Sequence, residues 1–288
     1  MGKLLFDSHA HINYERYTDE ERVVLMDSIE ASPVAYVVDV GFGMESSRQA
    51  IEDANARPWC YAAVGVHPHD ADVFNGDCIR ELKELLQEPK VVALGEIGLD
   101  FYRDYSSRDS QRKTFRDQLR LALESGMPIV IHDRESGGET LKILKEEGAF
   151  SNERKSAFRP NPDTGISDAR VLMHCFAGSA EQVWEYIELG CTISIAGPVT
   201  YKNNKKTVRV VECCENDPEF KCLPLSHLLI ETDAPYLTPE PFRGKPNVSP
   251  YVEYVARKIA ELRNISYEEV AIATCENAKR FFEIDKRA

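Results

Sequence analysis

The feature that most constrains this fold is a repeated alternation of short apolar runs with amphipathic segments. Eight runs rich in β-branched and other apolar residues recur, and apolar character is nearly continuous within each of them. Parallel strands that are covered on both faces have this pattern. The expected strands are Leu4–Asp7, Ala35–Val40, Tyr61–Val66, Val91–Leu94, Ile129–Ile131, Val171–Met173, Thr192–Ile195 and Leu228–Ile230.

Segments with helical periodicity separate most of these runs. The expected helices are Glu21–Ala31, Ile79–Gln87, Arg112–Ser125, Thr140–Glu147, Ala180–Leu189, Val252–Leu262 and Tyr267–Phe282. Parallel strands joined by helices over 288 residues predict an α/β fold, a single (β/α)8 TIM barrel spanning residues 1–288 as one domain. An open doubly wound sheet competes, but it usually has a glycine-rich turn after its first strand, and this chain has Asp7-Ser-His9-Ala-His11 there.

Two stretches depart from regular barrel spacing, residues 150–168 and 238–250, and both are expected to be loops. Residues 150–168 are rich in Pro, Asn, Ser and Arg, which predicts an irregular insertion. Such a segment is either a mobile surface loop or a lid over a functional site.

The overall charge and the N-terminus restrict the classes of function. A net charge of −13 argues against broad attraction to polyanions or anionic membranes, so any nucleic-acid contact must be local. No long uncharged apolar run is present, which excludes a transmembrane helix. The apolar stretch before Asp7 is too short for a signal peptide, so we expect a cytoplasmic protein. Its 8 cysteines form no C-x-x-C pair and are expected to be mostly small buried side chains.

Histidines and acids gather at the C-terminal ends of the expected strands, which meet at one mouth in a parallel barrel. Residues far apart in the chain therefore become neighbours there. The strand-end residues are His9, His11, Asp39, His67, Glu96, His132, His174 and Asp233. In contrast, His227 begins its strand, so we expect it on the opposite face in a structural role.

The His9-Ala-His11 spacing suits a metal site, because residues i and i+2 of a strand point to the same side. Four imidazoles with two carboxylates form a mixed nitrogen and oxygen set, richer in nitrogen than a pure Mg²⁺ site. Six ligands exceed the needs of one tetrahedral ion. We therefore expect two divalent cations that share a carboxylate, with Glu96 as the bridge and Zn²⁺, Mg²⁺ and Mn²⁺ as candidates.

Several short motifs resemble those of the TatD family of metal-dependent deoxyribonucleases, in the same order and over nearly the whole chain. They are Asp7-Ser-His9-Ala-His11, Gly65-Val-His67-Pro-His69, Gly95-Glu96-Ile-Gly-Leu-Asp100, Ile131-His132, His174-Cys-Phe176, Glu231-Thr-Asp233-Ala-Pro235 and Arg243-Gly-Lys-Pro-Asn247. The resemblance implies a TIM barrel of the metallo-dependent hydrolase superfamily. It also implies one ion held by His9, His11, Glu96 and Asp233. A second ion would be held by Glu96, His132 and His174.

The activity that the resemblance implies is hydrolysis of DNA phosphodiesters, including 3′–5′ removal of nucleotides from DNA ends. We expect water activated by the two cations to give its proton to Asp233 and to attack the phosphorus, so Asp233 and Glu96 are the predicted catalytic residues. The expected partner is DNA with single-stranded or frayed 3′ ends. No membrane and no obligatory protein partner is implied.

Supporting roles are predicted for residues beside these ligands. Asp100 and Tyr102 could orient a ligand histidine or a water, whereas the alternative for Asp100 is capping the next turn. The neutral imidazole of His67 could contact the scissile phosphate, or it could be a hydrogen-bonded loop histidine. Arg134 could bind a substrate phosphate or pair with a nearby acid.

A basic loop after the last strand is the predicted phosphate clamp, although short basic loops are often merely solvated. Its residues are Arg243, Lys245 and Asn247. This loop favours the nuclease. The net acidity favours a second hypothesis, in which the same barrel and ions act on a small-molecule ester, lactone or amide. A non-catalytic binding module is the third possibility, disfavoured because a full set of hydrolytic ligands is present.

Overall fold

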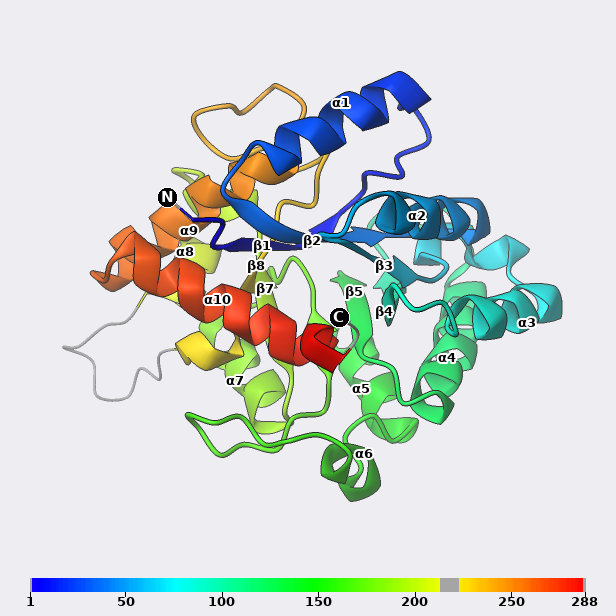
Figure 1. Cartoon of the computed structure of the whole chain (residues 1–288). Helices are drawn as coiled ribbons and strands as arrows, with labels where there is room; N and C mark the ends of the chain where they lie inside the picture. The colour runs from blue at the N-terminus through cyan, green and yellow to red at the C-terminus, as the bar shows by residue number, and fades with distance from the viewer. Residues whose placement is uncertain (1, 213–222, 287–288) are drawn as a thin grey trace.

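The strands form an eight-stranded parallel sheet that pairs in chain order (Figure 1). The structure is a computed structural model and describes residues 2–212 and 223–286. The strands are β1 Leu5–Ala10, β2 Val34–Val40, β3 Cys60–Val64, β4 Val91–Asp100, β5 Ile129–Arg134, β6 Val171–Met173, β7 Thr192–Ile195 and β8 Leu228–Ile230. The predicted α/β barrel is confirmed.

The first and last strands meet just beyond β8. The backbone N–H of Asp233 donates to the carbonyl of His9 at 2.9 Å, and that of His11 donates to the carbonyl of Ala234 at 2.8 Å. A parallel bridge joins Ala10 to Ala234. The sheet is therefore nearly closed, and its closure places Asp233 beside the two histidines of β1.

Helices follow most of the strands and cover the outside of the barrel (Figure 1). They are α1 Asp19–Glu30, α2 Met44–Ala56, α3 Gly76–Leu85, α4 Arg108–Glu124, α5 Glu139–Glu146, α6 Asn152–Ser156, α7 Ala180–Glu188, α8 Lys205–Val211, α9 Val252–Arg263 and α10 Tyr267–Phe282. Local chemistry fixes several starts. At α1, for example, Thr18 and Glu21 form a reciprocal capping box. The sequence pattern did not predict α2, α6 or α8.

The core has two parts, one between the strands and the outer helices and one inside the barrel. Interior residues from successive strands, such as Phe6 and Val38, pack with Phe281 and Phe282 of α10. The rings of Phe6 and Phe282 stack with centroids 5.9 Å apart. Because α10 also packs against β1 and β8, it closes the barrel at the end opposite the strand C-termini.

Strand β4 is longer than the expected Val91–Leu94 and continues to Asp100, with every residue buried. Its register with β5 shifts between Leu94 and Ile97. Gly98 allows the close pairing, because its φ of +145° and its contact with the backbone of His132 leave no room for a Cβ. Glu96 and Asp100 therefore lie within β4, in the part of the strand that runs beside β5.

The segment 150–168 is not the wholly irregular insertion that the sequence suggested, since it contains helix α6. Buried Arg154 of α6 donates to the carbonyls of Ala169 and Met127, which precede β6 and β5. Asn161 donates to the carbonyl of Ser226 and Thr164 contacts His227, both just before β8. The segment thus packs at the N-terminal ends of the strands, which rules out a lid over the opposite mouth.

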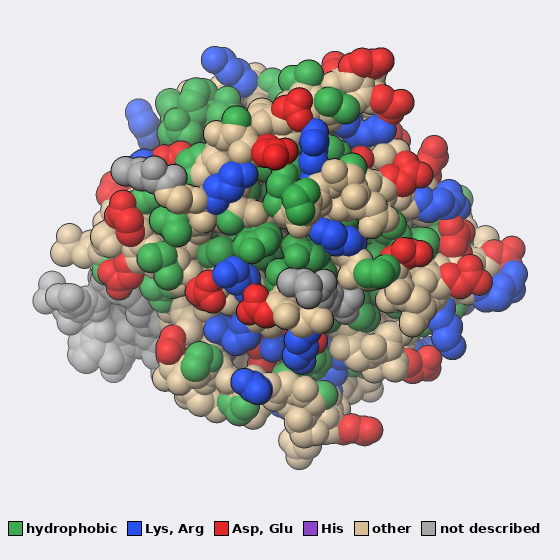
Figure 2. Space-filling view, viewed as in Figure 1, with side chains coloured by type: hydrophobic (Ala, Val, Ile, Leu, Met, Phe, Trp, Pro, Cys, Tyr) green, Lys and Arg blue, Asp and Glu red, His purple; other side chains and the backbone are tan. Residues whose placement is uncertain are grey.

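The surface and the cysteines are consistent with the sequence analysis. Basic and acidic side chains are interspersed over the face drawn in Figure 2. Within the described residues, no helix is long and apolar enough to span a membrane. Three described cysteines are buried and two partly buried, all unpaired: Cys60, Cys191 and Cys275, then Cys78 and Cys175. Three further cysteines lie outside the described residues: Cys213, Cys214 and Cys222.

Candidate metal centre

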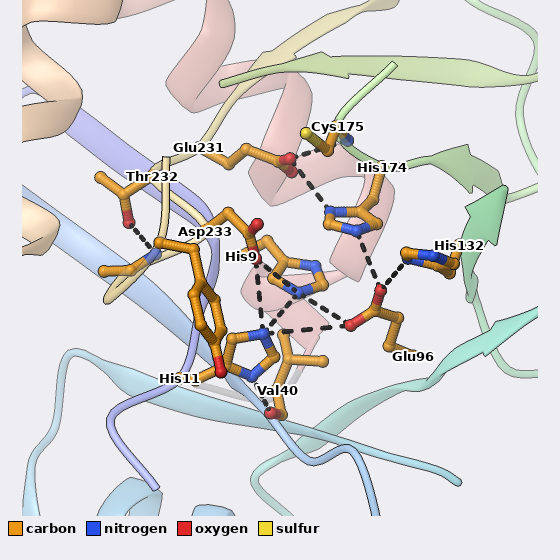
Figure 3. Close-up of polar contacts among 12 residues, drawn as sticks. His9, His11, Val40, Glu96, His132, His174, Cys175, Glu231, Thr232 and Asp233 are labelled. Atoms are coloured by element: carbon orange, nitrogen blue, oxygen red, sulfur yellow. Dashed lines mark hydrogen bonds and ion pairs between the residues drawn. The ribbon is translucent and has the colours of Figure 1, made fainter. Parts of the chain in front are cut away.

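The six predicted ligand side chains converge at the C-terminal end of the barrel (Figure 3). They come from five strands or the residues directly after them: His9, His11, Glu96, His132, His174 and Asp233. Glu96 lies between two groups of nitrogens, and each of its carboxylate oxygens faces one group (Figure 3).

The first group surrounds Oε2 of Glu96. This oxygen lies 3.4 Å from Nε2 of His9 and 3.9 Å from Nε2 of His11. The two Nε2 atoms are 3.3 Å apart. Asp233 completes the group, with Oδ1 3.4 Å from Nε2 of His11 and 3.8 Å from Nε2 of His9. Two imidazoles and two carboxylates thus face one small volume.

The second group surrounds Oε1 of Glu96. Nδ1 of His132 lies 2.6 Å from this oxygen and Nε2 of His174 lies 3.0 Å from it. Nε2 of His67 is 3.5 Å away. The sequence resemblance assigned His67 no metal, yet the structure puts it close to the second group.

Hydrogen bonds outside the centre determine which histidine nitrogens can coordinate an ion. Nδ1 of His11 lies 2.7 Å from the carbonyl of Val40, and a carbonyl only accepts, so Nδ1 carries the proton and Nε2 has a free lone pair. Nδ1 of His174 contacts the carboxylate of Glu231 at 3.0 Å with the same result. The lone pairs on Nε2 of His11 and His174 then both face Glu96. A divalent cation needs such unprotonated nitrogens as ligands. The donor set therefore fits metal ions.

Imidazoles and carboxylates inside the centre shift each other's pKa values. Burial alone would raise the pKa of Glu96, but the neighbouring His174 and His67 hold it well below its usual range. Burial opposes a proton on His132, but hydrogen bonds to Asp100 and Glu96 raise its pKa to about 9. Protons on imidazoles therefore offset the buried carboxylates. Divalent cations would displace those protons on binding.

Asp100 makes contacts that suit both of the roles that the sequence left open. Its Oδ2 lies 2.8 Å from Nε2 of His69 and 3.4 Å from Nε2 of His132. Its Oδ1 accepts the backbone N–H groups of Tyr102 and Arg103, which caps the turn after β4. The carboxylate thus supports His132 from behind and shapes the loop at the same time.

Among the described residues, Tyr102 makes no contact with a predicted ligand histidine, and its predicted role in orienting a histidine or a water stays a prediction. Its side chain is 54% exposed, and the guanidinium of Arg134 lies 4.0 Å from the centre of its ring. Arg134 itself has no acid within ion-pair distance among the described residues, so the predicted ion pair with an acid does not form. Both side chains lie at the rim of the mouth instead.

The basic loop after β8 divides into exposed and buried members. Arg243 and Lys245 are exposed, as a phosphate clamp requires. Asn247 is wholly buried, and its amide donates to the carbonyls of Thr232 and Tyr236. The expectation that Asn247 binds substrate is therefore corrected, because its polar atoms are used in holding the loop against β8.

Two further buried acids support the centre, of which Glu231 was not singled out from the sequence and Asp39 was expected at its strand end. Glu231 accepts hydrogen bonds from His174, from the backbone N–H of Cys175 at 2.7 Å, and from the hydroxyl of Ser194. Glu231 comes two residues before the predicted ligand Asp233. This spacing was the one signal in the sequence that could have pointed to Glu231. Asp39 lies at its strand end as expected and holds the turn after His11 by accepting the N–H of Ile12 at 2.8 Å.

A nearly closed (β/α)8 barrel with a buried His, Glu and Asp cluster at the strand C-termini defines the class of metal-dependent hydrolases. The family model described as TatD related DNase matches residues 6–283. The chain belongs to this family, and it is a hydrolase.

Relatives cover almost the whole chain. A Bacillus subtilis protein, the uncharacterized metal-dependent hydrolase YabD, is 43% identical over 98% of this chain and 100% of its own. The 3′–5′ ssDNA/RNA exonuclease TatD of Pectobacterium parmentieri is 30% identical over 97% of this chain and 100% of its own. The crystal structure of YjjV, a TatD homologue from Escherichia coli K12, superposes with a TM-score of 0.82 at 27% identity, covering 98% of this chain and 99% of that one.

Proposed function

We propose that this protein is a deoxyribonuclease that hydrolyses phosphodiester bonds at single-stranded or frayed 3′ ends of DNA in the 3′–5′ direction. The observation that carries the proposal is the placement of Glu96, whose two carboxylate oxygens each face a separate group of imidazoles. This placement suits two ions that share one carboxylate. The Pectobacterium relative is named as a 3′–5′ ssDNA/RNA exonuclease, which supports the choice of substrate.

The proposed ligands follow the two groups around Glu96. His9, His11, Asp233 and Oε2 of Glu96 would hold one ion, and His132, His174 and Oε1 of Glu96 the other. Divalent cations there, with Zn²⁺, Mn²⁺ and Mg²⁺ as candidates, would supply positive charge against the phosphodiester and activate water near neutral pH. Glu231 and Asp100 keep the second pair of histidines oriented.

Asp233 is the proposed general base. Its side chain is 16% exposed, compared with 5% for Glu96, so it is the more accessible of the two carboxylates from the mouth. Oδ1 faces His11, and no hydrogen bond to Oδ2 occurs among the described residues. Burial would raise the pKa of Asp233, but the contact with His11 keeps it below its usual value, so the carboxylate is ionised and Oδ2 can accept the proton of the attacking water.

His67 is proposed to donate a hydrogen bond to the phosphate. Its Nδ1 accepts the backbone N–H of His69 at 3.2 Å, so the ring proton resides on Nε2, which faces the centre. Burial lowers the pKa of His67 to about 4, so the imidazole is neutral near pH 7 and still donates. A neutral donor can stabilise charge on a phosphate oxygen without repelling cations beside it.

The experiment that tests the proposal follows both metal content and hydrolysis. Purified protein would be analysed for bound metal and incubated with 3′-labelled single-stranded DNA and Mg²⁺, Mn²⁺ or Zn²⁺. We expect shortening from the 3′ end that chelation stops. Glu96→Ala should lose both ions, whereas Asp233→Asn should lower the rate by more than a hundredfold while the second ion remains bound.

A panel of chromogenic esters, lactones and amides provides the comparison, since the net charge of −13 favours a small substrate. Turnover of a panel member without trimming of DNA would replace the nuclease by that activity. Trimming of DNA without turnover of the panel would exclude the small-molecule alternative.

A further inference from the structure

The arginines of this chain differ in whether an acid neutralises them. Many exposed arginines on the outer helices pair with carboxylates, as Arg112 does with Glu139 at 2.6 Å and Arg48 does with Glu81. Some arginines at the rim of the mouth have no acidic partner among the described residues, and each of these lies over a tyrosine ring instead. They are Arg16, Arg103, Arg134 and Arg243.

One group of these side chains follows β4 and β5, and we call it the Tyr102 cluster: Tyr102, Arg103, Tyr105 and Arg134. The guanidinium of Arg134 lies 4.0 Å from the centre of the Tyr102 ring. Arg103 lies 5.8 Å from the Tyr102 ring and 6.0 Å from the Tyr105 ring. The side chains of Tyr102 and Tyr105 are 54% and 65% exposed.

A second group follows β1 and β8, and we call it the Tyr236 cluster: Tyr14, Arg16 and Tyr236. The rings of Tyr14 and Tyr236 meet edge to face with centroids 5.8 Å apart, and Arg16 lies 5.9 Å from the Tyr14 ring. Tyr236 is 49% exposed. In the basic loop after β8, the guanidinium of Arg243 lies 4.2 Å from the centre of the Tyr201 ring.

The two clusters adjoin different parts of the metal centre. The Tyr105 ring packs on His69 with centroids 4.8 Å apart, and His69 contacts Asp100, which also supports His132. The Tyr236 ring packs on His11 with centroids 6.2 Å apart. One cluster therefore lies beside the second group of ligands and the other beside the first.

Exposed aromatic faces with unpaired arginines match the chemistry of single-stranded nucleic acid. Unpaired bases stack on tyrosine rings irrespective of their sequence, and guanidinium groups bind the phosphates between them. In a duplex the bases are already stacked on each other, so the rings gain little. A small ester held within the centre would not reach the rim.

We propose that the Tyr102 cluster and the Tyr236 cluster bind consecutive nucleotides of a single strand on either side of the scissile phosphate. The proposal rests on the proposed nuclease function and adds to it the residues that select single strands. When a strand binds, bases occupy ring faces and the arginines move from those rings to phosphates. Four guanidinium charges at the rim also attract a polyanion locally, despite the net charge of −13.

Fluorescence anisotropy of a labelled ten-nucleotide thymidylate with phosphorothioate linkages tests this proposal in the metal-loaded protein. Tyr102→Ala and Tyr236→Ala should each weaken binding roughly 5- to 100-fold, because one stacked base is lost. Arg134→Met should also make the slope of log affinity against log salt concentration shallower by about 0.7. Arg48→Met, which removes an ion-paired arginine, is the matched control and should change neither quantity. Metal content and melting temperature verify that each variant is folded.

The outcomes separate the two proposals. If DNA is trimmed but the tyrosine and Arg134 variants bind within twofold of the wild type, the clusters have no binding role and the nuclease function stands. Equal affinity of the wild type for the probe and for its blunt duplex with deoxyadenylate would overturn the selection of single strands. Failure of the wild type to bind the probe at all would overturn the clusters and count against the nuclease.

Discussion

Nδ1 of His174 and Oε1 of Glu231 are hydrogen-bonded at 3.0 Å, and this contact determines which histidine nitrogen faces Glu96. Both residues are buried, so the imidazole has little freedom to rotate away. A carboxylate behind a ligand histidine also raises the basicity of its coordinating nitrogen. Glu231 is therefore a positioning residue for the proposed second ion.

Glu231→Gln is expected to weaken binding of one metal ion by about 10- to 100-fold while the other stays bound. The amide lacks the negative charge that holds the proton on Nδ1 of His174. Metal titration of chelated protein by calorimetry measures the change. Ser194→Ala removes only one hydrogen bond to Glu231 and should have a smaller effect. Unchanged affinity in Glu231→Gln would show that His174 needs no support from this carboxylate.

His67→Gln is expected to lower kcat by roughly 10- to 1,000-fold, because the neutral donor that faces the phosphate is displaced. Metal content should not change. Single-turnover hydrolysis of 3′-labelled DNA with parallel metal analysis distinguishes the two roles open to His67, which lies 3.5 Å from Glu96. Loss of an ion in this variant would make His67 a ligand rather than a donor to substrate.

Asn247→Ala is expected to reduce the free energy of unfolding by about 1–3 kcal/mol for each buried carbonyl left without its donor. Urea denaturation followed by circular dichroism measures this loss. Lys245→Met, an exposed substitution in the same loop, should alter stability by no more than about 0.5 kcal/mol. A stable Asn247→Ala protein with impaired DNA binding would return Asn247 to the phosphate clamp.

His227 gives the native state a dependence on pH. Burial, only partly offset by the carbonyl of Cys191, lowers the pKa of His227 below its ordinary value of 6.5. The unfolded chain therefore takes up the proton first as pH falls, so the stabilising contribution of neutral His227 is present above pH 6.5 and decreases below it. Between pH 7.5 and pH 5, the free energy of unfolding should fall more in the wild type than in His227→Gln. Urea denaturation at each pH measures both proteins. An equal fall in the free energy of unfolding of the wild type and of His227→Gln would contradict this prediction.

Sequence reasoning predicted the fold because a regular alternation of apolar strand-like runs and amphipathic helical segments is compatible with few architectures. It also predicted which side chains meet, since parallel strands bring their C-terminal ends together. Side-chain alternation accounts for His9 and His11, and Glu231 and Asp233 have the same spacing. Glu231 went unrecognised because a carboxylate that binds a histidine from behind looks no different in sequence from any other acid near a strand end.

The errors have local physical causes. Helix α2 lacks a continuous apolar stripe, so tertiary packing against β3 rather than periodicity makes it helical. Strand β4 was ended too early because Gly95 and Gly98 normally interrupt strands, whereas here they permit close pairing with β5. Asn247 followed two exposed basic residues, and only the three-dimensional loop reveals that its amide turns inward.

The backbone contact that joins His9 to Asp233 also determines when this chain can become active during its synthesis. His9 leaves the ribosome early, and Asp233 follows only after seven further strands have been translated. Until then the pocket lacks one wall, and the growing polypeptide has no complete centre with which to hydrolyse a substrate.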